Sequence, residues 1–364
     1  MKKSFRTWIA KKIARTMLYI KATTYNKPTK KGEEEENKKE EKDRKKPYIW
    51  ACGLPMWIYN DNRMMLGNYR HRSKITRGFS FLLKERNINP DFIIGTASSG
   101  IAPAASLAQS LGKELLINID SDFYSFKKDL HLEQGIRESE ADLIISTSPS
   151  AIPYGVQHAN KLGIGFAYVR SEKKDHGKGQ LIEGNIKPGM KFFFIYNEKT
   201  LEEIDEITKS LEVEFKIKLL GSMRLKDLHI KMSSEELKGK KAVVIEDLFS
   251  TGGSSTFQVH LAREAGMICN HCFSIFSYGF SCLRKQFSGE INIGNKEVKL
   301  STPCEIDSLL TFPTLLKVII QGQFYPMEKI EAMKEEIEGF DERYRLFLAE
   351  KAKILENNIN PVKK

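Results

Sequence analysis

Two adjacent carboxylates beside a glycine turn form the part of this sequence best suited to chemistry. Glu246 and Asp247 follow the apolar run 242–245 and precede the hydroxyl- and glycine-rich stretch 250–255. Paired glycines let the backbone curl so that successive N–H groups point into one concavity, which suits a phosphate at a helix N-terminus. The carboxylates suit ribose hydroxyls or a magnesium ion and would support positive charge on a sugar carbon. The alternative is a tight βα turn with an incidental acidic pair.

A cationic stretch that contains glycines is the second such feature. Arg170, Lys173, Lys174, His176 and Lys178 lie within nine residues. With few apolar anchors, such a segment is expected to be flexible and to close over a polyanion. A solvated, charged surface loop is the alternative.

Small hydroxyl residues occur in two related stretches. Residues 96–100 read Thr-Ala-Ser-Ser-Gly, so their N–H groups can approach an anion closely. In the related stretch 147–151, Pro149 removes one N–H and Ala151 replaces the glycine. We therefore expect the first stretch to bind an anion, although the second is the one that leads directly into the cationic stretch.

Together these stretches resemble the motifs of type I phosphoribosyltransferases, and more narrowly those of orotate phosphoribosyltransferases. The resemblance follows the order of the motifs and covers most of residues 8–340. It implies a type I phosphoribosyltransferase fold of the α/β class, with a mostly parallel sheet flanked by helices. A small hood of N-terminal and C-terminal segments and two inserted βα-like stretches complete the expected fold. The segments that carry the resemblance are 48–53, 58–63, 96–101, 166–179, 181–184, 242–255 and 274–280.

The resemblance implies a reaction and its partners. The 5-phosphoribosyl group of phosphoribosyl pyrophosphate (PRPP) would pass to orotate, giving orotidine 5′-phosphate and pyrophosphate in de novo pyrimidine synthesis. Magnesium would arrive with PRPP near Glu246 and Asp247, without a metal site fixed by the protein alone. A homodimer that shares the cationic loop across subunits is also implied.

Each residue that matches a motif takes a role from the resemblance. Lys174 would be the main catalytic cation. The full catalytic set is Lys174, His176, Glu246 and Asp247. The PRPP-binding set is Arg170, Lys173, Lys174, His176, Glu246, Asp247, Leu248, Phe249, Ser250, Thr251, Gly252, Gly253 and Ser254. The pyrophosphate loop is Thr96, Ala97, Ser98, Ser99 and Gly100. The orotate-binding set is Tyr59, Asn62, Arg63 and Ser250, with core packing as the alternative for Tyr59.

One departure bears on activity. Where the family usually has a lysine and a Ser-Pro pair, this chain has Pro55, Met56 and Trp57. The loss of that cation predicts reduced efficiency or an inactive protein.

The elements expected to position these residues are βα units. From Asp91 onward, short apolar runs alternate with helical segments that end in glycine, which predicts a mostly parallel sheet. Residues 91–112 match 142–163 at 9 of 22 positions with an offset of 51, which favours duplication of a βα unit. A fainter echo relates 189–195 to 239–245 at an offset of 50, and it could be chance. The turn after that echo, 196–201, has no glycine and one carboxylate, so it is not expected to bind phosphate.

Composition and charge divide the chain. Residues 1–26 form a predicted basic amphipathic helix of the hood, with a membrane-surface helix or a transit peptide as alternatives. Residues 27–46 form a charged linker, and 341–364 a helical tail. Between them, 47–340 form the phosphoribosyltransferase domain, with insertions near 121–165 and 192–237. The net charge of +11 falls mostly on residues 1–46, which contain 16 Lys and Arg against 7 Asp and Glu, so no nucleic-acid partner is expected.

The five cysteines are too scattered for a disulfide framework. They favour a reducing, cytoplasmic setting, and no apolar run is long enough to span a membrane. The spacing of Cys269 and Cys272 is that of half a zinc site, but the stretch is predicted to be a strand.

Two alternatives to the enzyme are kept open. One is a non-catalytic regulator of the same fold that binds PRPP or a nucleotide. The other is a phosphoribosyltransferase that acts on another base, such as a purine.

Overall fold

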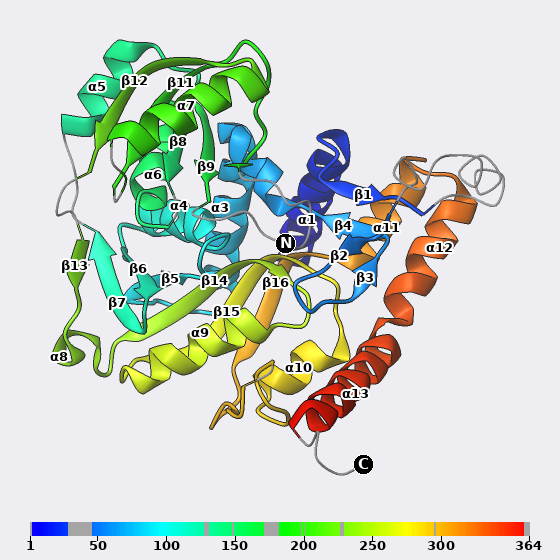
Figure 1. The fold of residues 1–364 in the computed structure, drawn as a ribbon. Coiled ribbons are helices and arrows are strands. Elements are labelled where there is room, and N and C mark those ends of the chain that lie inside the picture. Colours follow the sequence, from blue (N-terminus) through cyan, green and yellow to red (C-terminus); the bar gives the residue numbers. More distant parts are fainter. Residues whose placement is uncertain are drawn as a thin grey trace.

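The fold is an α/β arrangement built on two large sheets. The computed structural model describes residues 2–27, 46–126, 131–147, 149–170, 182–197, 199, 201–225, 229–294 and 296–359. Figure 1 shows one large sheet across the lower half of the molecule and the other at its upper left. Within the described ranges, no helix combines the length and the apolar character that a membrane crossing needs.

The larger sheet has seven strands in the order β13-β7-β6-β5-β14-β15-β16. Its pairings are parallel except those of β7 with β6 and with β13. The strands are β5 (Phe92–Gly95), β6 (Glu114–Ile119), β7 (Asp122–Phe126), β13 (His229–Lys231), β14 (Lys241–Phe249), β15 (Ile268–Ser277) and β16 (Glu305–Thr311).

Helices cover both faces of this sheet because its central strands are apolar on both faces. On one face, Val243 belongs to a core that includes Leu107 of α4 (Ile101–Leu111) and Phe79 of α3 (Tyr69–Glu85). On the other, Val244 packs in a second core with Val259 of α9 (Gly253–Glu264). The predicted α/β class with a mostly parallel, helix-flanked sheet is confirmed.

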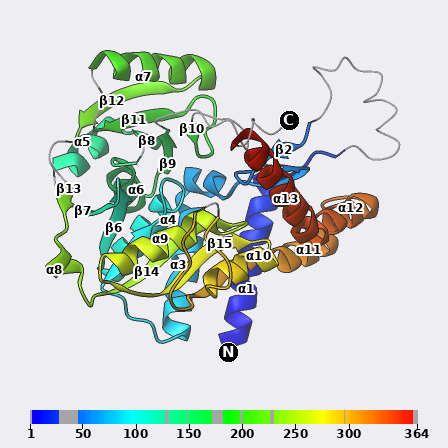
Figure 2. The ribbon, with the colours of Figure 1, turned by 60° about the horizontal axis from the view of Figure 1, so that its bottom comes forward.

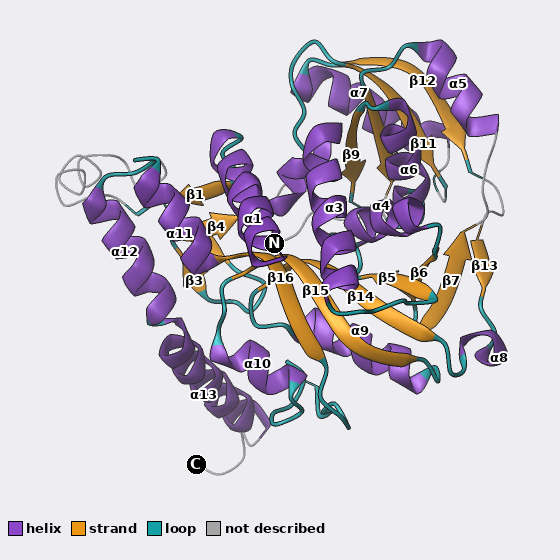
Figure 3. Ribbon diagram, turned by 180° about the vertical axis from the view of Figure 1, so that it is seen from behind, coloured by secondary structure: helices purple, strands orange, loops and turns teal. Residues whose placement is uncertain are grey.

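The second sheet has five strands in the order β10-β9-β8-β11-β12, and only the β9–β10 pairing is antiparallel. Figures 1 and 3 place α4 and α6 between the two sheets. The strands are β8 (Leu143–Thr147), β9 (Gly165–Val169), β10 (Ile182–Glu183), β11 (Lys191–Tyr196) and β12 (Lys218–Arg224), and the accompanying helices are α5 (His131–Ser139), α6 (Ile152–Leu162) and α7 (Leu201–Phe215).

The second sheet repeats the first in strand order and in register. β8 pairs with β9 from Leu143↔Gly165, as β5 pairs with β6 from Phe92↔Glu114, at an offset of 51. The orders β10-β9-β8-β11-β12 and β7-β6-β5-β14-β15 correspond strand for strand. We call residues 142–224 the inserted repeat, and residues 91–126 with 239–277 the core repeat.

The fainter echo belongs to the same duplication. The β11–β12 pairing shifts register between Phe192 and Phe193, and the β14–β15 pairing shifts between Ala242 and Val243, at an offset of 50. A chance similarity of two strands would not reproduce the same irregularity. The sequence predicts two insertions, 121–165 and 192–237, and strands of both (β8, β11 and β12) lie with β9 and β10 in one sheet. Strands β7 and β13 of the same two ranges belong instead to the larger sheet.

The hood and the terminal helices lie on one side of the larger sheet, as Figure 2 shows for α1 and for α11 to α13. The hood elements are α1 (Lys2–Tyr19), β1 (Thr23–Tyr25), β2 (Tyr48–Ile49), β3 (Pro55–Met56), β4 (Ile58–Asn60) and the 3-10 helix η2 (Asn62–Gly67). The remaining helices are α8 (Ser234–Leu237), α10 (Ser281–Phe287), α11 (Phe312–Gln321), α12 (Met327–Glu338) and α13 (Phe340–Ile359).

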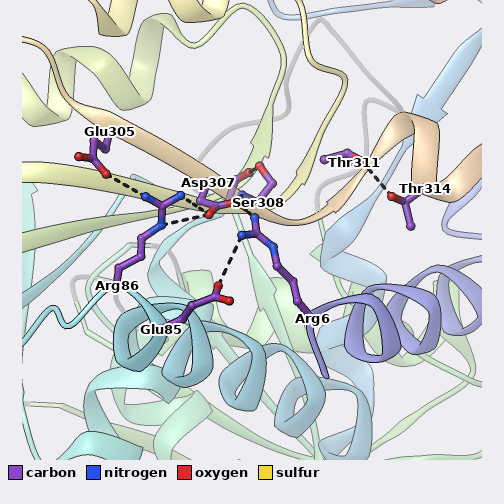
Figure 4. Close-up of polar contacts among 9 residues, drawn as sticks. Arg6, Glu85, Arg86, Glu305, Asp307, Ser308, Thr311 and Thr314 are labelled. Carbon is purple, nitrogen blue, oxygen red and sulfur yellow. Dashed lines mark hydrogen bonds and ion pairs between the residues drawn. The ribbon is translucent and has the colours of Figure 1, made fainter. Parts of the chain in front are cut away.

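Buried apolar residues and ion pairs hold α1 against the rest of the fold. Ile13 and Met17 are fully buried in the main core. Arg6 of α1 forms an ion pair with Asp307 of β16, and Arg86, just after α3, pairs with the same carboxylate at 2.7 Å (Figure 4). Because Asp307 is largely buried and faces two guanidinium groups, it joins α1, α3 and β16 at one point.

The predicted strand around Cys269 and Cys272 is confirmed as β15. Both thiols are buried, and burial raises the pKa of Cys269 to about 12. In the part of the chain that the structure describes, no group of three or more His, Cys, Asp or Glu residues is arranged to hold a metal.

Candidate active site

The candidate site is a cavity of about 890 Å³ at the carboxyl ends of β5 and β14. Its walls come from the turn before α9, the loop after β5, the hood and the end of β9. In an open parallel sheet, the carboxyl ends of the strands are the usual place for a ligand.

The acidic pair lies on the floor of this cavity, and both Glu246 and Asp247 line it. The Asp247 N–H donates to Glu246 Oε1 at 2.8 Å, and Asn62 Nδ2 donates to the Asp247 carbonyl at 2.6 Å. Burial, and then the neighbouring charge of Asp247, raise the pKa of Glu246 well above its usual range. A cation, or a group with hydroxyl donors, would relieve this crowding of negative charge.

The turn that follows has the geometry of a phosphate cradle. Gly252 has a φ of +89°, and α9 begins at Gly253 with no side-chain cap, so its first N–H groups are available to an anion. Ser250, Thr251 and Ser254 line the cavity beside them. A Cβ on Gly252 would lie 2.5 Å from Leu283 Cδ1, so both conformation and space require glycine there.

A glutamine holds this turn in place from behind. Gln286 Nε2 donates to the Thr251 carbonyl at 2.9 Å, and Gln286 Oε1 accepts from the Gly294 N–H at 3.1 Å. Gln286 is buried on α10.

Three other residues of the predicted PRPP-binding stretch differ in their exposure to the cavity. Leu248 and Gly253 line it, whereas Phe249 is fully buried against Phe287. A ligand in the cavity could therefore contact the backbone of Phe249 but not its ring.

The first of the two related hydroxyl stretches lies beside the acidic pair. β5 pairs with β14 up to Gly95↔Ile245, and the Thr96 N–H donates to the Ile245 carbonyl at 3.1 Å. A Cβ on Gly100 would lie 2.4 Å from that same carbonyl, so glycine lets the loop pack against β14. Thr96, Ala97 and Ser99 line the cavity, whereas Ser98 and Gly100 do not.

The second hydroxyl stretch follows β8 in the other sheet. Ser150 accepts a hydrogen bond from Asn197 Nδ2 at 3.3 Å, and none of residues 147 and 149–151 lines the cavity. The first stretch therefore lies at the cavity, whereas the described residues of the second do not, and the binding of pyrophosphate by the first stays a prediction.

The hood contributes Tyr59 and Arg63 to the cavity wall. Arg63 donates to Tyr59 Oη at 2.8 Å and to Asp61 at 2.8 Å. Burial raises the pKa of Tyr59 to about 12, so the phenol stays protonated. Asn62, predicted to bind orotate, is fully buried behind the wall, where it positions Asp247. Tyr59, in contrast to Asn62, both packs in the hood and faces the cavity.

Two residues of the inserted repeat reach the same cavity. Arg170 at the end of β9 and Glu183 of β10 both line it, and Arg170 Nε lies 2.5 Å from Glu183 Oε1. The same carboxylate oxygen accepts from Arg63 at 2.6 Å, which ties the hood to the inserted repeat. Lys173, Lys174 and His176 lie outside the described residues, and their roles stay predictions.

Some lining residues carry no sequence signal. Lys296 lies in a loop before β16, where its Nζ is 4.0 Å from the centre of the Phe257 ring. Asn118 of β6 and Tyr344 of α13 also line the cavity, but neither belongs to a motif. Trp50 is buried against Tyr278 and also reaches the cavity wall.

Fold and site together place an acidic pair and a glycine turn at the carboxyl ends of the strands of a mostly parallel, helix-flanked sheet. No family model matches the chain. It is 26% identical over 301 residues to the orotate phosphoribosyltransferase of Streptococcus sanguinis (strain SK36), covering 83% of this chain and 86% of the relative. The similar protein of Lactococcus lactis subsp. lactis (strain IL1403) is 24% identical over 289 residues, covering 79% of this chain and 84% of that relative.

Among solved structures, the orotate phosphoribosyltransferase from Aeropyrum pernix aligns with 84% of this chain and 97% of its own chain, at 12% identity and a TM-score of 0.41. The curated relatives confirm the resemblance that the motifs predict.

Proposed function

We propose that the protein is an orotate phosphoribosyltransferase, a pentosyltransferase of pyrimidine synthesis. The observation that carries this proposal is the meeting of three motifs in one cavity: the acidic pair, the turn before α9 and the loop after β5. The curated relatives named orotate phosphoribosyltransferase support the choice of base. We also propose the cytoplasm as its location, in keeping with five free cysteines.

Each part of PRPP has a matching part of the site. The 5′-phosphate would bind the first N–H groups of α9 and the hydroxyls of Ser250, Thr251 and Ser254. The ribose hydroxyls would face Glu246 and Asp247. The pyrophosphate would lie against the loop of Thr96, Ala97 and Ser99, which is next to the acidic pair because β5 pairs with β14.

The acidic pair fits a magnesium ion that is carried in by PRPP. Two adjacent carboxylates at the cavity floor are hard oxygen ligands of the kind that this ion prefers. When bound, the ion would neutralise part of the pyrophosphate charge.

The chain's own groups would favour a transition state with positive charge on the sugar. A nitrogen of orotate bonds to C1 of the ribose while the C1–O bond to pyrophosphate breaks, its electron pair leaves with pyrophosphate, and the nitrogen releases its proton. The carboxylates of Glu246 and Asp247 stabilise the positive C1, because charge that develops in the transition state is where fixed charges contribute most.

Cations are needed at the opposite end, where pyrophosphate departs. We assign Lys174, with Lys173, His176 and Arg170, to that role, by the resemblance and by the charge of the stretch. Lys174→Ala is expected to lower turnover much more than PRPP affinity. Equal losses in both would show that Lys174 is a ground-state binding residue.

Tyr59 and Arg63 from the hood, and Ser250 from the turn before α9, would orient orotate, with Asn62 acting through Asp247. The resemblance on its own implies a homodimer, whereas the place of Arg170 and Glu183 in the cavity favours a site completed within one chain. A non-catalytic regulator would bind PRPP without turnover, and a purine enzyme would use a different base.

One assay separates these candidates. Purified protein is mixed with PRPP, magnesium and orotate, and the loss of orotate is followed, with uracil and hypoxanthine as control bases. Consumption of orotate alone supports the proposal. PRPP binding without turnover of any base favours the regulator, and turnover of hypoxanthine favours the purine enzyme.

A further inference from the structure

The two repeats contact each other in the manner of a two-fold dimer. In such an interface, if residue i of one copy contacts residue j of the other, then j of the first contacts i of the second. The offset of 51 makes Ser106 equivalent to Gln157, and Gln109 equivalent to Asn160.

Both members of this reciprocal pair of contacts are present between α4 and α6. Gln109 Nε2 donates to the Gln157 carbonyl at 3.0 Å, and Asn160 Nδ2 donates to Ser106 Oγ at 2.9 Å. Between them, Asn160 Nδ2 donates to Gln109 Oε1 at 3.2 Å, so two equivalent residues meet at the centre. α4 and α6 also span equivalent residues, and each ends at a left-handed glycine, so the contacts between the repeats have the reciprocity that an internal two-fold axis requires.

The repeats divide the parts of the site between them. In the core repeat, β14 has the acidic pair near its carboxyl end, whereas the equivalent positions of the inserted repeat are Tyr196 and Asn197. Conversely, the inserted repeat has Arg170 at the end of β9, where the core repeat has Ile119 at the end of β6. Glu183 of β10 corresponds by register to Tyr124 of β7.

The residues that differ between the two repeats lie around one cavity. Arg170 and Glu183 of the inserted repeat line the same cavity as the acidic pair and the glycine turn of the core repeat. Both are largely buried, and they are joined to each other and, through Arg63, to the hood. A contact across the internal axis therefore completes the wall of the cavity.

We propose that the inserted repeat stands where the second subunit of a two-fold dimer would stand, and that it completes the site of the core repeat within one chain. Arg170, held in place by Glu183, then acts in cis, and one chain carries one PRPP site. The identity of this ligand rests on the function proposed above. The division of the site between the repeats rests on their contacts alone.

Mixing two variants tests whether the repeats act within one chain. Asp247→Asn disables the core repeat's part of the site, and Arg170→Gln disables the inserted repeat's part. We expect orotate turnover to fall in both, with Arg170→Gln raising the KM for PRPP at least tenfold, and Arg170→Lys restoring part of this loss. Co-expressed from differently tagged genes and purified together, the two variants should show no more than the sum of their separate activities.

Two outcomes of the mixing experiment would overturn the inference. One is recovery to about a quarter of wild-type activity, which is expected when a symmetric dimer exchanges subunits and the residues act between chains. The other is full activity of Arg170→Gln alone, because that residue would then be no part of the site.

Calorimetry with PRPP and magnesium gives a readout that does not need turnover. We expect one PRPP per chain in the wild type, weaker binding in Arg170→Gln and unchanged binding in Asn197→Ala, the inserted repeat's counterpart of Asp247. Two PRPP molecules per chain would overturn the inference, and so would a loss of binding in Asn197→Ala. Binding once per chain without orotate turnover would defeat only the orotate reaction, whereas no binding at all would defeat both proposals.

Discussion

The core repeat and the inserted repeat have the same backbone plan but different side chains at the ends of their strands. Lys241 N–H donates to the Asp91 carboxylate at 2.8 Å, and Lys191 N–H donates to the Asp142 carboxylate at 3.0 Å, at equivalent positions. Each interaction fixes the start of a central strand against its neighbour. The two repeats thus share the contacts that fix the register of their strands.

The difference lies at the other end of the same strands. Glu246 in the core repeat and Tyr196 in the inserted repeat are both almost fully buried. Tyr196 stacks on Phe194, with ring centres 6.2 Å apart, in a separate apolar core of the inserted repeat. A buried carboxylate costs stability, whereas a buried aromatic ring adds it. The core repeat thus has a destabilising group where the site needs it, and the inserted repeat has an apolar contact at the equivalent position.

The largest contrast is expected when equivalent strand ends are changed. Asp247→Ala should lower turnover roughly 10²–10³-fold, since it removes a charge that stabilises the transition state. Asn197→Ala should leave turnover within about twofold, since its side chain contacts Ser150 and neither residue lines the cavity. Steady-state kinetics with orotate checks both. Comparable losses in the two variants would remove the functional distinction between the repeats.

The buried carboxylate should also make stability depend on pH. A Glu whose pKa is raised on folding contributes stability at low pH, and that contribution is lost as pH rises from the ordinary carboxyl range through the raised pKa of Glu246. Glu246→Gln should flatten this fall, by up to about 1.4 kcal/mol per pH unit. Urea unfolding at a series of pH values measures it.

Tyr196→Phe is the matched control for that experiment, since it removes no carboxylate. Its free energy of unfolding should follow the wild-type pH dependence. A wild-type slope that persists in Glu246→Gln would show that another group is responsible.

The glycine turn offers a third contrast. Gly252→Ala should lower the free energy of unfolding by about 2 kcal/mol, because an alanine there has an unfavourable φ and a Cβ that clashes with Leu283. PRPP affinity should fall with it. Gly163→Ala, at a positive φ in the inserted repeat with open space around it, should cost about 1 kcal/mol and leave PRPP affinity unchanged. Chemical denaturation and calorimetry distinguish these results.

The smallest expected effect concerns the contact between the repeats. Asn160→Ala should cost about 1 kcal/mol of stability, since it removes hydrogen bonds to Ser106, Gln109 and Arg72. Gln157→Ala should be nearly neutral, because that contact uses the Gln157 backbone carbonyl. An equal loss in both variants, measured by urea unfolding, would contradict the hydrogen-bonding scheme at the axis.

Local patterns made much of the core repeat predictable. An apolar run followed by carboxylates, hydroxyls and paired glycines predicts a strand, a turn and a helix. The structure has β14, its turn and α9 at these residues. The match of 91–112 to 142–163 likewise corresponds to β5 with α4 and β8 with α6. The extent of the duplication was harder to predict, because the strands from 189 and from 239 share little beyond apolar character. Their common register appears only in the pairing.

By itself, the sequence determined the motifs, their order along the chain and the βα character of the segments that carry them, because glycine, hydroxyl and apolar spacing act locally. Tertiary structure decided which hydroxyl loop lies beside the acidic pair, since that depends on β5 pairing with β14 and β8 with β11. It also brought Arg63 and Arg170 to the single carboxylate of Glu183. Contacts between residues so distant in sequence follow from strand order and burial across the whole fold, which no local pattern encodes.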